Sequence, residues 1–125
     1  MRYVYIVIGG GIGALLRYFS SRFINLSLNS TFPFGTLFVN CAGALLIGFL
    51  TGLFNALSVD MKWRLFAITG FLGGYTTFST YSLETVQYLI AGNIKHALVN
   101  ILLNNVLCIV FVLLGVWLNK IVAAK

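Results

Sequence analysis

The chain has 125 residues, of which 60% are hydrophobic and 8% are charged, and it contains a single proline. This composition is typical of integral membrane proteins and excludes a soluble globular domain. A membrane-spanning helix needs about 20 mostly apolar residues, so we expect four or five spans and no extramembrane domain. The net charge of +6 is spread over the predicted span ends, which suits anionic lipid headgroups better than nucleic acid.

Apolar runs separated by turn residues predict an all-α membrane protein, one domain over 1–125 with four transmembrane helices. The expected spans cover about 3–24, 34–57, 63–91 and 97–118. The third is nearly thirty residues long and has a polar middle. We therefore expect the third helix to be broken mid-membrane into two half-helices.

Basic residues lie near the ends of the predicted spans. If the spans alternate in direction, five basic residues fall on the side of the termini and three on the other: Arg2, Lys62, Arg64, Lys120 and Lys125 against Arg17, Arg22 and Lys95. The positive-inside rule then favours cytoplasmic termini, but the bias is shallow. The sequence is therefore compatible with insertion in both orientations.

Three pairs of glycines are spaced by four residues, which places both members of a pair on the same helix face. The pairs are Gly9 with Gly13, Gly48 with Gly52, and Gly70 with Gly74. Such strips of small residues let another helix backbone approach closely. They predict a compact helix bundle, and an oligomer.

The most polar segment of the chain lies inside the third predicted span. Residues 75–82 read Tyr-Thr-Thr-Phe-Ser-Thr-Tyr-Ser, so seven of eight consecutive side chains carry a hydroxyl. Polar groups at membrane depth are costly unless they face protein, water or a transported solute. Gly73 and Gly74 precede the run and permit a break in the helix. This segment is the candidate functional site.

Two further polar side chains fall within predicted spans. Arg17 either extends its charge toward the interface or forms a vestibule that attracts anions. Asn40 either bonds a neighbouring helix or offers its two amide hydrogens to an anion. Thr36, one helical turn earlier, would share the face of Asn40.

Glu84 is the one acidic residue well inside a predicted span. It has three open roles: a proton-coupling site, a structural partner for Arg17, or a cation ligand. The sequence contains no Ser-His-Asp set, no metal-spaced cluster of His or Cys and no phosphate-binding loop. These absences argue against an enzyme.

Three segments together resemble the Fluc (CrcB) family of bacterial fluoride channels. They are residues 73–82 (Gly-Gly-Tyr-Thr-Thr-Phe-Ser-Thr-Tyr-Ser), 35–40 (Gly-Thr-Leu-Phe-Val-Asn) and 13–18 (Gly-Ala-Leu-Leu-Arg-Tyr). The resemblance covers essentially the whole chain in length, number of spans and order of motifs.

The resemblance implies an antiparallel, dual-topology homodimer in the bacterial inner membrane, with two pores that export fluoride. It also implies a central Na⁺ ion held by the backbone carbonyls of Gly73 and Thr76. Phe78 would be the first pore phenylalanine and Asn40 the pore asparagine. The remaining residues of the implied sites are Ser79, Thr80, Tyr81 and Thr36 in the pore and Arg17 and Glu84 in the vestibules.

The chain departs from the family pattern at two places. The second pore phenylalanine is replaced by Tyr81, which keeps the positive ring edge and adds a hydroxyl. The fourth span lacks the hydroxyl residues common in the family, and its polar side chains are Asn100, Asn104 and Asn105. Residues of the second and third spans would therefore supply more of the pore lining.

Two other classes of membrane protein compete with a channel. A small dual-topology multidrug exporter also has four short helices, but it typically carries an essential carboxylate in the first helix, and residues 3–24 contain none. A structural subunit of a larger complex would have scattered polar residues rather than a run of hydroxyls beside glycines. The sequence favours the channel over both.

Overall fold

The structure is a computed structural model that describes residues 1–124, and every regular element in that range is helical. Three of the helices are long and apolar enough to cross a membrane. These are α1 (Arg2–Leu28), α2 (Phe34–Ala56) and α6 (Ile94–Ala123). The prediction of an all-α membrane protein is confirmed.

The segment between α2 and α6 is built from four consecutive helical pieces. They are α3 (Met61–Arg64), η1 (Leu65–Leu72) with π-helical hydrogen bonding, α4 (Gly73–Tyr75) and α5 (Phe78–Ile90). In the described residues the backbone between α4 and α5 is extended, with φ −86° and ψ 157° at Thr76 and φ −150° and ψ 112° at Thr77. The helical direction is therefore interrupted within the hydroxyl-rich run.

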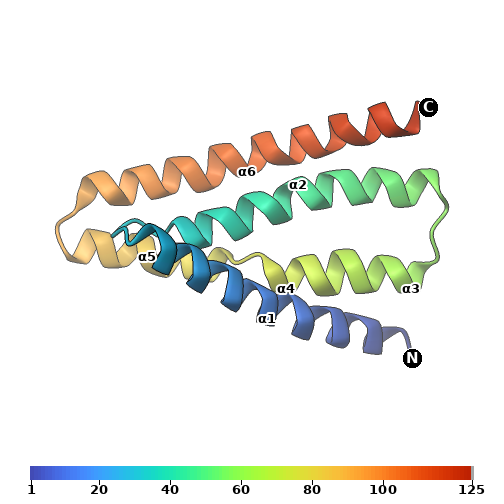
Figure 1. Cartoon of the computed structure of the whole chain (residues 1–125), viewed down its shortest axis with the longest axis horizontal. Helices are drawn as coiled ribbons and strands as arrows, with labels where there is room; N and C mark the ends of the chain where they lie inside the picture. The colour runs from blue at the N-terminus through green and yellow to red at the C-terminus, as the bar shows by residue number, and fades with distance from the viewer. Residues whose placement is uncertain (125) are drawn as a thin grey trace.

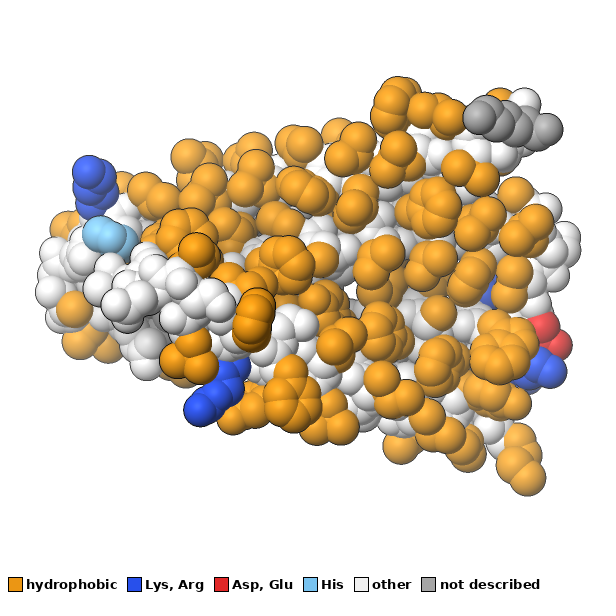
Figure 2. Space-filling model, viewed as in Figure 1, with side chains coloured by type: hydrophobic (Ala, Val, Ile, Leu, Met, Phe, Trp, Pro, Cys, Tyr) orange, Lys and Arg blue, Asp and Glu red, His pale blue; other side chains and the backbone are white. Residues whose placement is uncertain are grey.

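The long helices lie side by side, and the chain passes from one end of the bundle to the other between them (Figure 1). The N-terminus, the described C-terminal residues and the connection between α2 and α3 lie at one end. Figure 2 shows hydrophobic side chains over most of the visible face, with the charged side chains toward its two ends. This distribution matches an apolar bilayer core bounded by two polar interfaces.

The predicted close helix packing is confirmed at the glycine strips. A Cβ atom added to Gly13 of α1 would lie 3.0 Å from the backbone nitrogen of Tyr75, so α1 contacts η1 and α4 backbone to backbone. Gly48 of α2 faces the backbone of Val112 in α6 in the same way. Gly52 differs, because it faces the side chain of Asn119 and no backbone.

Candidate functional site

The hydroxyl-rich run folds as an extended pair of residues followed by a capped helix. Thr77 precedes α5 as its N-cap, and its side-chain oxygen accepts a hydrogen bond from the backbone N–H of Thr80 at 3.2 Å. A threonine in extended conformation is a favourable N-cap because its hydroxyl satisfies an otherwise unpaired helix donor. The local sequence therefore specifies both the end of the interruption and the start of α5.

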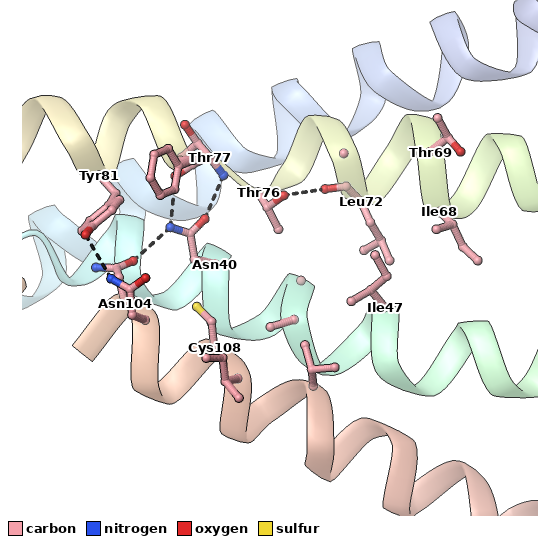
Figure 3. Close-up of a pocket in the computed structure, with 17 residues that line it drawn as sticks. Asn40, Ile47, Ile68, Thr69, Leu72, Thr76, Thr77, Tyr81, Asn104 and Cys108 are labelled. Atoms are coloured by element: carbon pink, nitrogen blue, oxygen red, sulfur yellow. Dashed lines mark hydrogen bonds between the residues drawn. The ribbon is translucent and has the colours of Figure 1, made fainter. Parts of the chain in front are cut away.

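The side chain of Asn40, on α2, forms hydrogen bonds with both backbone groups of the extended residue Thr77. Its Oδ1 accepts from the Thr77 N–H at 2.8 Å, and its Nδ2 donates to the Thr77 carbonyl at 3.1 Å. The same Nδ2 also donates to Oδ1 of Asn104 at 3.0 Å (Figure 3). Both amide hydrogens of Asn40 therefore have protein partners, and the side chain acts on the backbone at the interruption.

The hydrogen bond from the Thr77 N–H to Asn40 takes the helical donor away from the carbonyl of Gly73. In a continuous α-helix the N–H of residue 77 would donate to the carbonyl of residue 73. Here that N–H donates to Asn40 instead. The carbonyl of Gly73 consequently loses its regular helical partner, and Gly73 itself is exposed beside a pocket.

A pocket of about 610 Å³ lies between the interruption, α2 and α6. It brings together five predicted site residues: Asn40, Gly73, Thr76, Phe78 and Tyr81. The rings of Phe78 and Tyr81 meet edge to face with centroids 5.2 Å apart. Phe78 is 75% exposed although it is a large apolar residue, whereas Tyr81 is buried. The surface of the pocket is mostly apolar, and an exposed aromatic edge in it can interact with an anion without a formal positive charge.

The hydroxyl of Tyr81 points toward α6 and accepts a hydrogen bond from Nδ2 of Asn105 at 3.1 Å (Figure 3). Within residues 1–124 this is the one hydrogen bond that the hydroxyl makes. Because the oxygen acts as the acceptor, its hydrogen is available to a ligand in the pocket.

Three other predicted residues lie in a separate pocket of about 250 Å³: Arg17, Thr36 and Thr80. Thr77 lines both pockets and separates them. Ser79 lines neither pocket; it is exposed, and its hydroxyl lies 3.4 Å from that of Thr77. The structure therefore places the predicted pore residues other than Ser79 in two separate pockets that share Thr77.

Glu84 lies on α5 and is tied to α2. The hydroxyl of Thr36 donates to its Oε1 at 2.6 Å, while its Oε2 is buried and has no hydrogen-bond partner among the described residues. In that part of the chain, the only ion pair within 4.0 Å joins Lys62 to Asp60. Glu84 and Arg17 are therefore not paired, and the carboxylate instead borders a third pocket, of about 420 Å³, near Tyr88.

Four residues of the site were not among the predicted ones: Thr77, Asn100, Asn104 and Asn105. Asn104 contacts Asn40 directly, and Asn100 contacts Asn104 one helical turn away. Both side chains are almost fully buried. Their spacing of four residues puts them on one face of α6, which is the sequence signal that identifies them as a pair.

Comparison with known proteins identifies the family. The family model "CrcB-like protein, Camphor Resistance (CrcB)" matches residues 4–116. The protein "Fluoride-specific ion channel FluC" of Campylobacter fetus subsp. fetus is 43% identical over 96% of this chain and 94% of its own length. Proteins of the same name are 46% identical in Ruminiclostridium cellulolyticum, over 93% of this chain and 90% of theirs, and 41% identical in Parabacteroides distasonis, over 92% and 90%. By the extent and identity of these matches, the chain belongs to the CrcB family.

Proposed function

We propose that this protein is a fluoride-selective ion channel that lets cytoplasmic fluoride leave the cell down its electrochemical gradient. The observation that carries the proposal is the pocket that Phe78 and Tyr81 both line, where the Tyr81 hydroxyl has a hydrogen available to a ligand. Membership of a family whose relatives are named fluoride-specific channels supports the same activity. The protein acts as a channel rather than an enzyme.

The chemistry of this pocket suits a small, strongly hydrated anion. A pore must replace the water around fluoride with several close hydrogen-bond donors or positive dipoles. Hydroxyl hydrogens and aromatic ring edges provide these without a full charge, so the ion is not trapped. The second pocket adds Thr80 and the guanidinium of Arg17, which would attract anions toward the pore.

The working unit in this proposal is an antiparallel, dual-topology homodimer with two pores in the bacterial inner membrane. The pocket beside Phe78 is open, and a second copy of the chain would close it. The shallow difference in basic residues between the two ends supports insertion in both orientations. The relatives come from bacteria, which supports the assigned membrane.

The proposal includes a structural Na⁺ ion on the two-fold axis, coordinated by the carbonyls of Gly73 and Thr76 from both subunits. The local backbone fits this role, because the helical donor of the Gly73 carbonyl is diverted to Asn40 and Thr76 is extended. Carbonyl oxygens at membrane depth need a partner, and a cation provides one. Within residues 1–124 no three His, Cys, Asp or Glu side chains come together as a metal-binding group.

The activity is tested by fluoride efflux from liposomes that contain the purified protein. Vesicles loaded with potassium fluoride, with valinomycin to carry the compensating potassium, should release fluoride rapidly to a fluoride electrode. Vesicles loaded with potassium chloride should retain chloride, because the proposed channel is selective for fluoride. Equal release of both anions, or release no faster than from protein-free vesicles, would refute the proposed activity.

The dual topology is tested by labelling a single introduced cysteine. Lys95→Cys, in a variant with Cys41 and Cys108 replaced by serine, places a thiol at the exposed start of α6. A membrane-impermeant maleimide applied to intact cells should label about half of the chains, because the two orientations are equally represented in an antiparallel dimer. Labelling of all chains or of none would establish a single orientation.

A further inference from the structure

A continuous series of hydrogen bonds runs from the interruption through α2 and α6 to α5. Asn40 donates to Oδ1 of Asn104, and Nδ2 of Asn104 donates to Oδ1 of Asn100 at 2.9 Å and to its backbone carbonyl at 3.2 Å. Nδ2 of Asn100 donates to the hydroxyl of Thr85 at 3.0 Å, and that hydroxyl donates to the carbonyl of Tyr81 at 2.9 Å. We call the pair Asn100 and Asn104 the asparagine ladder.

The hydrogen bonds of the asparagine ladder can run in only one direction from donor to acceptor. The backbone carbonyl of Asn100 can only accept, so the side chain of Asn104 must turn its Nδ2 toward Asn100. Its Oδ1 then faces α2 and requires a donor there, which is Nδ2 of Asn40. The Oδ1 of Asn40 is thereby left for the N–H of Thr77. The contact with α6 therefore requires the same orientation of the Asn40 amide as the N–H and the carbonyl of Thr77 do.

The ladder is also shielded from water. Asn100 is 0% exposed, Asn104 5% and Thr85 7%. In such surroundings hydrogen bonds strengthen one another, and the loss of one partner leaves a buried polar group unpaired. Loss of one hydrogen bond of the ladder should therefore weaken the hydrogen bonds of Asn40, although Asn100 does not contact the interruption.

We propose that the asparagine ladder is a positioning element of the anion pathway. It orients Asn40, and Asn40 keeps Thr77 extended and its N–H away from the carbonyl of Gly73. Phe78 follows directly and is placed in the pocket by this geometry. The inference rests on the proposed channel activity and assigns a role to Asn104 and Asn100, neither of which is proposed to touch the ion.

The test combines amide hydrogen exchange at Thr77 with fluoride efflux in Asn104→Leu. Leucine branches at the same position but is larger, and it cannot accept from Asn40. Exchange of the Thr77 amide should become faster, and fluoride efflux should fall about tenfold, because Asn40 loses its contact with α6 and holds Thr77 less firmly. Adding Asn104→Leu to Asn40→Leu should lower efflux no further than Asn40→Leu alone, since both changes break the same chain.

Two variants complete the design. Asn119→Leu makes the same substitution on the same helix about four turns away and outside the pocket, and it should leave exchange and efflux unchanged. Thr85→Val, nearly the same shape, breaks the far end of the series and should change both measurements in the same direction but less. If Asn104→Leu does not fold, Thr85→Val still allows amide exchange at Thr77 and fluoride efflux to be measured.

The outcomes separate this inference from the proposed function. Unchanged exchange at Thr77 in both Asn104→Leu and Thr85→Val would overturn the positioning role, whatever happens to efflux. Faster exchange at Thr77 in a protein whose wild type passes no fluoride would support the ladder and refute the channel activity.

Discussion

Replacing Phe78 by isoleucine is expected to lower fluoride efflux about a hundredfold, which corresponds to about 2.7 kcal/mol in the barrier. An aliphatic side chain has no positive edge, so the change removes the proposed contact with the ion together with the edge-to-face contact with Tyr81. Phe78 is 75% exposed in the subunit and contributes little to its packing. The lost activity should therefore appear without loss of the folded protein, in the liposome efflux assay.

Phe38→Ile provides the matched control for this prediction. Phe38 is also an exposed phenylalanine, but it lies on α2 and does not line the pocket. The same substitution there should leave the efflux rate close to that of the wild type. If Phe78→Ile conducts fluoride at the wild-type rate, the ring edge has no part in permeation and the proposed pathway is wrong.

Replacing Asn40 by aspartate is expected to reduce fluoride efflux to that of protein-free vesicles. The carboxylate can still accept from the N–H of Thr77, but it cannot donate to the Thr77 carbonyl or to Oδ1 of Asn104. Two acceptors would then face a negative charge in a mostly buried site, which is strongly unfavourable. The extended backbone at Thr77 should be lost together with the pathway.

The measurement for Asn40→Asp is efflux together with size-exclusion chromatography, which reports whether the assembly persists. Asn29→Asp, in the exposed connection after α1, should behave like the wild type in both assays. Wild-type efflux from a well-assembled Asn40→Asp protein would remove Asn40 from any role at the site.

The helical class and the close packing of the bundle could be predicted from local information. Apolar runs of sufficient length have one physical solution in a bilayer, and glycines four residues apart mark where a second backbone can approach. Gly13 and Gly48 lie at such contacts. The run of hydroxyl side chains around Thr77 likewise predicted a functional segment. Moving polar groups from water into lipid costs free energy, and this cost can be recognised from the residue types alone.

The internal connections of the site could not be predicted in the same way. Whether Asn40 faces an anion or the backbone of Thr77 depends on how α2 packs on α4 and α5, and its bond to Asn104 joins residues 64 positions apart. Thr36 illustrates the same limit, since its hydroxyl donates to Glu84 of α5. Tertiary packing decides which of several possible hydrogen-bond partners a polar side chain takes. A single sequence does not contain that information.

The central claim is that this chain forms a pore selective for fluoride, and its most direct test is the reversal potential in a planar bilayer. With fluoride on one side and an equal concentration of chloride on the other, the account predicts a current carried by fluoride alone. The reversal potential should then lie far from zero, at the sign set by the fluoride gradient. A reversal potential at zero, which indicates equal permeability to the two anions, would contradict the account.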